Sequence, residues 1–187
     1  MVGKVVILSA PSGSGKTTLA RHLLSVEKLN FKFSVSATTR KKRDHEINGK
    51  DYFFFSPEEF KDSIENQDFI EYEKVYQNMY YGTLKSEVNN LIVNHNIVFD
   101  VDVLGALSLK KYFKSLAISI FIKPPSIDVL EKRLIDRKKN DPGEIKERIR
   151  KAEIEMKKEA DFDTVIINKD LDVAKQELID KVEKFLK

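Results

Sequence analysis

Short apolar runs alternate along the chain with longer segments in which apolar residues recur at helical spacing. The apolar runs cover residues 5–8, 97–101, 116–122 and 164–167. Short runs that are apolar throughout are typical of strands covered on both faces, as in a parallel sheet. The pattern therefore predicts an α/β fold, in which a parallel sheet is flanked by helices.

Helical spacing predicts helices over residues 16–26, 84–94, 127–137, 144–159 and 171–186. In the last of these, Leu171, Ala174, Leu178 and Val182 form a single apolar stripe. A further helix is expected directly after Ser56. There the sequence Ser-Pro-Glu-Glu offers a capping serine, a proline at the first helical position and a glutamate that completes a capping box.

The segment from about residue 35 to residue 83 interrupts this alternation. It holds many of the aromatic residues, in short strand-like runs that are separated by turn signals at Asn48-Gly49 and Gln77-Asn78. We interpret it as a small mixed β insert. A chain of 187 residues otherwise has the size of one compact domain.

Composition excludes several classes of protein. The absence of cysteine excludes a disulfide scaffold, a zinc–thiolate site, an iron–sulfur cluster and a cysteine nucleophile. The chain has 33 Lys+Arg and 30 Asp+Glu, and a net charge of only +3 argues against a nucleic-acid partner. Since neither a signal peptide nor an apolar run of about 20 residues is present, we expect no membrane association and a cytoplasmic location.

The strongest motif lies between the first predicted strand and the first predicted helix. Small residues in such a loop let backbone N–H groups surround phosphate oxygens, and the following helix adds its positive end. The lysine reaches the β and γ phosphates of a bound triphosphate, and the Thr17 hydroxyl would bind Mg²⁺. The alternative is a Gly/Ser turn that only joins strand to helix, but the flanking elements favour a P-loop. The motif is Ala10-Pro11-Ser12-Gly13-Ser14-Gly15-Lys16-Thr17.

Four consecutive cations, Arg40-Lys41-Lys42-Arg43, stand at the start of the predicted insert. Such a run is commonly a solvated loop, and a targeting signal or a nucleic-acid patch is the next interpretation. The two arginines are three residues apart, and a guanidinium fork suits a phosphate monoester. Residue types alone leave these alternatives open.

Carboxylates mark two places where a ligand could be recognised. Glu71 lies in the run Phe69-Ile70-Glu71-Tyr72, and Asp100 and Asp102 alternate at the end of an apolar strand. Open parallel sheets bind ligands at their carboxyl edge. A helix cap or a surface charge is the simpler interpretation for a single carboxylate, but two in alternation favour a site. Asp100 resembles the acid that helps to hold Mg²⁺ in P-loop enzymes.

Taken together, these motifs resemble those of the guanylate kinase family, from about Lys4 to the C-terminus. The matching stretches are Ala10 to Thr18, Phe33 to Arg40 with Arg43, Asn48 to Tyr52, Phe69 to Glu71, Tyr80 to Thr83, Asp100 to Asp102, Arg133, Arg137, Arg148, and Val165 to Asn168.

The resemblance implies a role for each matching residue. Arg40, Arg43, Tyr52 and Tyr81 would hold the phosphate of GMP. Ser36, Glu71, Thr83 and Asp102 would read guanine, and Asp100 would lie between GMP and the magnesium-bound phosphates. Mg²⁺ would be held by Thr17 and by Asp100, directly or through water. ATP would be bound by Ala10, Pro11, Ser12, Gly13, Ser14, Gly15, Lys16, Thr17, Thr18, Arg133 and Asn168.

The resemblance also implies a helical lid over about residues 127–159, around the polar loop at residues 138–143. Arg137 and Arg148 flank this loop, and with Lys16 they would stabilise the transferred group. The simpler interpretation is that these charges cover the solvated faces of two helices. The core would then comprise residues 1–34, 84–126 and 160–187, beside the insert at about 35–83.

The implied activity is transfer of the γ-phosphoryl group of ATP to GMP, and also to dGMP, with Mg²⁺. Two alternatives stay open. One is another nucleoside monophosphate kinase, and the other is a non-catalytic guanylate-kinase-like interaction module. The expected partners are small-molecule substrates, and the sequence leaves a monomer and a homodimer equally open.

Overall fold

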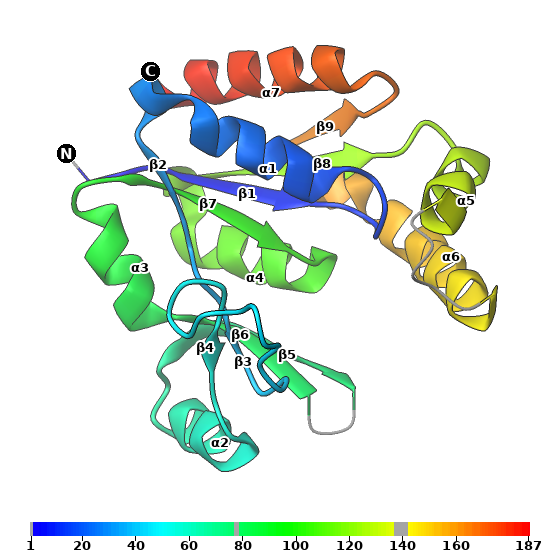
Figure 1. The fold of residues 1–187 in the computed structure, drawn as a ribbon. Coiled ribbons are helices and arrows are strands. Elements are labelled where there is room, and N and C mark those ends of the chain that lie inside the picture. Colours follow the sequence, from blue (N-terminus) through cyan, green and yellow to red (C-terminus); the bar gives the residue numbers. More distant parts are fainter. Residues whose placement is uncertain (1, 77–78, 137–141) are drawn as a thin grey trace.

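The computed structural model describes residues 2–76, 79–136 and 142–187 (Figure 1). Over these residues the chain forms a parallel sheet in the strand order β2-β7-β1-β8-β9 and a mixed sheet in the order β4-β3-β6-β5. The strands are β1 (Val5–Ser9), β2 (Phe31–Phe33), β3 (Ala37–Thr38), β4 (Phe53–Phe54), β5 (Phe69–Tyr76), β6 (Met79–Leu84), β7 (Asn96–Val101), β8 (Ala117–Lys123) and β9 (Thr164–Ile167).

Helices cover both faces of the parallel sheet (Figure 1). The helices α1 and α7 lie on one face and α3 and α4 on the other, while α2 packs on the mixed sheet. The pair α5 and α6 lies beyond the carboxyl end of β1. Their bounds are α1 (Lys16–Ser25), α2 (Pro57–Glu65), α3 (Lys85–Ile92), α4 (Val103–Phe113), α5 (Ile127–Asp136), α6 (Pro142–Met156) and α7 (Leu171–Leu186).

The central strand β1 explains why both faces need helices. Val6 and Leu8 belong to the cluster under α1 and α7, whereas Val5 and Ile7 belong to the cluster under α3 and α4. Alternate side chains of a strand point to opposite faces, and these four are all apolar and fully buried. The apolar run therefore specifies a strand covered on both sides.

The mixed sheet forms a small aromatic core of its own. Phe60 of α2 is fully buried and stacks on Phe69 of β5, with the ring centroids 4.4 Å apart. Helix α2 begins as its sequence predicts. The Ser56 side chain accepts from the Glu59 backbone N–H, and the Glu59 side chain accepts from the Ser56 N–H. This cap fixes the start of the helix that covers the insert.

The helices α5 and α6 pack against each other through a separate apolar cluster. Leu130 and Leu134 of α5 meet Ala152 of α6, with Ile145 and Ile149 at the edge. The α6 residues in this contact are spaced four and three apart, so they share one face of the helix. The neighbouring face of α6 does not take part in this contact and has charged side chains, among them Arg148.

The structure confirms the predicted α/β class, the parallel sheet and the mixed β insert. Boundaries shift by a few residues: the helix expected over residues 144–159 runs over Pro142–Met156. Two elements were missed, the short edge strand β2 and the helix α4. The expected turn at Gln77-Asn78 and the residues 137–141 lie outside the described part of the chain. Within that part, no helix is both long and apolar enough to span a membrane.

Candidate active site

The loop after β1 has the conformation that a phosphate cradle requires. Gly13 and Gly15 have positive φ angles of 97° and 93°, which residues with a side chain rarely adopt. A side chain at Gly15 would also clash with the amide of Asn168. Helix α1 starts directly after Gly15 and has no acidic residue in its first turn, so its N-terminus is free to meet an anion.

Asn168, expected to bind ATP, supports this loop through a hydrogen bond. Its buried Nδ2 donates to the Ser14 carbonyl oxygen at 2.7 Å, and Arg133 donates to the Asn168 carbonyl oxygen at 3.0 Å. The same residues border a shallow groove on the outer side of the loop, together with Thr18. Asn168 and Arg133 therefore hold the loop in shape and also line the surface beside it.

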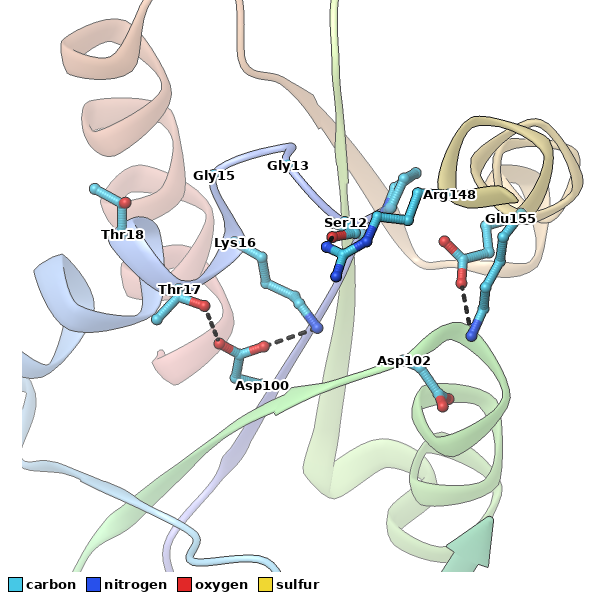
Figure 2. Close-up of a pocket in the computed structure, with 13 residues that line it drawn as sticks. Ser12, Gly13, Gly15, Lys16, Thr17, Thr18, Asp100, Asp102, Arg148 and Glu155 are labelled. Carbon is cyan, nitrogen blue, oxygen red and sulfur yellow. Dashed lines mark hydrogen bonds and ion pairs between the residues drawn. The ribbon is translucent and has the colours of Figure 1, made fainter. Parts of the chain in front are cut away.

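Lys16 and Thr17 meet Asp100 at the carboxyl edge of the sheet (Figure 2). The Lys16 ammonium lies 2.7 Å from Asp100 Oδ1 and donates to the Val101 carbonyl oxygen at 2.6 Å. The Thr17 hydroxyl donates to Asp100 Oδ2 at 2.8 Å. The parallel register places Leu8 beside Asp100, so the ends of β1 and β7 bring the three together.

These groups line a hollow that we call the P-loop pocket. Its volume is about 330 Å³, within the range of small-molecule sites. Helix α6 closes one side of it, and Figure 2 shows Arg148 and Glu155 approaching from that helix. Arg148 donates to the Ser12 hydroxyl at 3.3 Å. The lining residues are Ala10, Pro11, Ser12, Gly13, Gly15, Lys16, Thr17, Thr18, Asp100, Asp102, Arg148, Lys151 and Glu155.

The charged face of α6 explains these contacts. Arg148, Lys151 and Glu155 are spaced three and four apart, so they lie beside one another next to the apolar stripe that packs on α5. Lys151 lies 3.7 Å from Glu155, and burial raises the pKa of the Glu155 carboxyl. The sequence prediction missed Lys151 and Glu155, although their spacing from Arg148 is a usable signal.

A second hollow, the insert pocket, opens between the mixed sheet and the start of α4. Asp100 and Asp102 line both pockets, so the two hollows adjoin at these carboxylates. The lining residues of the insert pocket are Ser36, Tyr52, Glu71, Glu73, Tyr81, Gly82, Asp100, Val101, Asp102 and Gly105.

Glu71 is the principal carboxylate of the insert pocket. Its Oε1 accepts from the Thr83 hydroxyl at 2.6 Å, because β5 and β6 pair these two residues directly. Burial raises the pKa of Glu71, and the Thr83 hydrogen bond partly opposes that rise. A half-buried carboxylate with one oxygen held by a hydroxyl keeps its other oxygen for a ligand that donates hydrogen bonds.

Asp102 has a structural role in addition to its place in the pocket. Its Oδ1 accepts from the Gly105 backbone N–H at 2.8 Å, which caps the N-terminus of α4. The simpler interpretation of this carboxylate as a helix cap is therefore correct, and the residue still lines both pockets. The cap holds the Asp102 side chain in one orientation at the junction of the pockets.

The cationic run at residues 40–43 is organised by a carboxylate that the sequence prediction missed. Glu46 accepts from Nη1 and Nη2 of Arg40 at 3.0 and 2.6 Å, and from the Arg43 backbone N–H at 2.8 Å. The Arg40 guanidinium also lies over the Tyr52 ring, 5.2 Å from its centroid. Glu46 thereby positions Arg40 at the edge of the insert pocket, whereas the Arg43 side chain is exposed.

Glu46→Gln should lower stability in a way that depends on pH. The Arg40 hydrogen bonds, and then that of the Arg43 amide, lower the pKa of Glu46 from 4.5 to about 2. A carboxylate whose pKa falls on folding stabilises the protein fully above its unfolded pKa, and that contribution is lost as the pH falls toward the folded value. The difference in urea midpoint between wild type and variant should therefore be largest above pH 4.5.

Urea unfolding of both proteins between pH 7 and pH 3 measures this. The difference should shrink below pH 4.5, and a difference that stays constant with pH would contradict the ion pair. Glu65→Gln is the matched control, because Glu65 is an exposed carboxylate on α2 of the same insert. Its urea midpoint should track that of the wild type at every pH.

The structure brings most of the predicted site residues to one edge of the sheet. The P-loop pocket brings together Asp100, Asp102, Arg148 and the predicted P-loop residues except Ser14, which is buried. Ser36, Tyr52, Glu71 and Tyr81 meet around the insert pocket. Arg137 lies outside the described residues. What each residue does there stays a prediction.

Comparisons with known proteins agree with this geometry. A family model described as guanylate kinase matches residues 2–185. A curated guanylate kinase of Bacteroides thetaiotaomicron is 50% identical over 187 residues, which is 100% of this chain and 91% of the relative. A guanylate kinase of Porphyromonas gingivalis is 46% identical over 184 residues, covering 98% of each chain.

A solved structure gives the same result. The crystal structure of guanylate kinase from Anaplasma phagocytophilum superimposes with a TM-score of 0.75 and 26% identity, covering 99% of this chain and 87% of that one. The match extends over the sheet, the insert and the helices of the present chain. With its P-loop, its second pocket and these relatives, the chain belongs to the guanylate kinase family.

Proposed function

We propose that this chain transfers the γ-phosphoryl group of ATP to GMP, giving ADP and GDP. One observation carries the proposal: two pockets, one on a P-loop and one on the insert, share Asp100 and Asp102. Ligands in the two pockets would meet at these carboxylates. A phosphate donor and a phosphate acceptor held end to end are what a direct transfer needs.

In the proposed reaction a phosphate oxygen of GMP attacks the γ-phosphorus of ATP in line. A bond forms between that oxygen and phosphorus while the bond to the β–γ bridging oxygen breaks, and ADP leaves with the electron pair. Negative charge spreads over the equatorial oxygens, so cations provide most of the stabilisation. Lys16 and Arg148 line the P-loop pocket, in which ATP would bind, and Arg137 is proposed as a further cation.

Mg²⁺ fits the oxygen atoms that this site offers. The Thr17 hydroxyl and the Asp100 carboxylate lie 2.8 Å apart at the mouth of the P-loop, and hard oxygen ligands of this kind are those that Mg²⁺ prefers. We propose that Thr17 and Asp100 hold the ion, directly or through water. When bound, Mg²⁺ would neutralise charge on the phosphates of ATP. A cytoplasmic location belongs to the same proposal, because both substrates are soluble nucleotides.

The insert pocket supports guanine as the acceptor base. Guanine presents an N1–H and an exocyclic amine, from which a carboxylate such as Glu71 can accept, and an O6 to which a hydroxyl such as that of Ser36 can donate. Adenine would leave the buried Glu71 oxygen without a donor. A site built to pair such groups rejects the wrong ligand by a factor of about 10⁴.

The test is a coupled assay of ADP release with ATP, Mg²⁺ and one of GMP, dGMP, AMP, CMP or UMP. We expect kcat/KM for GMP to exceed that for AMP by about 10⁴. Glu71→Gln should lower kcat/KM for GMP by about 10²-fold, since the neutral amide replaces hydrogen bonds to a charged group. A preference for AMP or a pyrimidine nucleotide would contradict the guanine assignment.

A further inference from the structure

Glu73 lines the insert pocket together with Glu71 and Tyr81, to which roles in binding GMP have been assigned. It follows Glu71 by two residues on β5, so both side chains point to the same face of the strand. The register pairs Glu71 with Thr83 and Glu73 with Tyr81. The pocket therefore has a second carboxylate, one step further along the strand than the one assigned to the base.

The Glu73 carboxylate has an oxygen that nothing in the described protein satisfies. Its Oε2 is buried and lacks a hydrogen-bond partner among the described residues. The other carboxylates of the pocket differ, because Glu71 accepts from Thr83 and Asp102 accepts from Gly105. A buried carboxylate oxygen without a donor is costly, so its presence in a ligand pocket calls for a donor on the ligand.

The position along the strand indicates which part of the ligand that donor belongs to. Residues two apart on a strand are separated by about 6.6 Å. Glu73 pairs directly with Tyr81, whose ring lies 6.0 Å from that of Tyr52. With the base at Glu71 and Thr83 and the phosphate at the phenol ends of these two long side chains, the shorter Glu73 side chain would lie between them, alongside the sugar. A carboxylate only accepts hydrogen bonds, and a phosphate dianion has none to donate. The ribose hydroxyls are the donors of the nucleotide in this region.

We infer that Glu73 accepts a hydrogen bond from the 2′-hydroxyl of the acceptor nucleotide and selects GMP over dGMP. The inference rests on the proposed function of the insert pocket. It assigns to Glu73 a specificity role that is separate from base reading by Glu71 and from phosphate binding by Arg40.

The competing explanation for the buried Glu73 carboxylate is an ion pair with a lysine of α6. Glu73 also borders a small apolar hollow that it shares with Leu104, Lys151 and Lys158. Lys151 already lies beside Glu155, at 3.7 Å. The two explanations make different predictions, because an ion pair with Lys151 would affect GMP and dGMP equally, whereas a bond to the 2′-hydroxyl affects only the nucleotide that carries it.

The experiment compares kcat/KM for GMP and for dGMP in wild type, Glu73→Gln and Glu73→Ala. The wild type should prefer GMP by about 10- to 100-fold, the range for a hydrogen bond to a charged group. Glu73→Ala should bring this ratio close to one, mainly by loss of GMP turnover, and Glu73→Gln should give an intermediate ratio. Glu65→Ala, an exposed carboxylate of the same insert, should keep the wild-type ratio.

The outcomes distinguish a failure of this inference from a failure of the proposed function on which it rests. A wild type that uses GMP and dGMP equally would overturn the role of Glu73 without any variant. An unchanged ratio in Glu73→Ala, or equal losses for both nucleotides, would also overturn it, but the proposed function would stand as long as the wild type phosphorylates GMP. A wild type without GMP turnover would instead contradict the proposed function.

Discussion

Lys16→Ala should lower kcat for GMP phosphorylation by about 10²- to 10³-fold, the cost of removing one positioned donor from a transition-state site. Lys16 lines the P-loop pocket; its ammonium lies 2.7 Å from Asp100, and its side chain is 18% exposed. A water molecule in the place of the ammonium would have neither its positive charge nor its fixed position. A coupled assay with saturating ATP and GMP measures the effect.

The matched control is Arg21→Ala. Arg21 is an exposed cation on the same helix, α1, and it lies outside the residues that line the pocket. Its removal changes the net charge by the same amount and should leave kcat within about twofold, because exposed charges are largely screened. Turnover of Lys16→Ala within about tenfold of wild type would refute the role of the P-loop lysine.

Arg148→Ala should lower kcat by about 10³-fold, at the lower end of the range for a supplied arginine, since Arg137 is proposed as a second one. Arg148 is carried on α6, with its guanidinium 3.3 Å from the Ser12 hydroxyl at the rim of the P-loop pocket. An interaction made in the transition state changes kcat more than it changes KM. We therefore expect the KM for ATP to move far less than kcat.

Arg150→Ala tests whether this effect belongs to the position or to the charge. Arg150 is exposed, lies two residues further along α6, and is not among the lining residues of the P-loop pocket. A helix turns by about 200° over two residues, so the two arginines point in different directions. If both variants lost activity equally, the lining position of Arg148 would have no special role.

The fold could be predicted from the sequence where burial leaves a simple pattern. Strand β1 is fully buried and apolar at its first four positions, and α7 carries one apolar stripe. Helix α4 was missed because a single residue separates it from β7 and because its apolar residues lie on several sides. Neither the two-residue period of a strand nor the 3.6-residue period of a helix is therefore distinct there. The same close connection makes Asp102 both a strand-end residue and a helix cap.

The site was predicted in those parts where a local motif carries the chemistry. The P-loop is contiguous, and its conformation depends on glycines that the sequence names. The ion pair of Glu46 with Arg40 was missed because Arg40 belongs to a run of cations that is typical of a solvated loop. Glu73 and Lys151 were missed because their importance depends on which pocket their element faces. That information belongs to tertiary packing rather than to residue type.

The bond from Asn168 to Ser14 has a consequence for the order in which the molecule can assemble. The two residues are 154 positions apart, so the loop is braced by a residue, directly after β9, that is synthesised much later than the loop. Contacts between such distant residues form late, after the entropy of closing a long loop has been overcome. During synthesis the P-loop sequence is therefore present well before the Asn168 hydrogen bond that fixes its conformation can form.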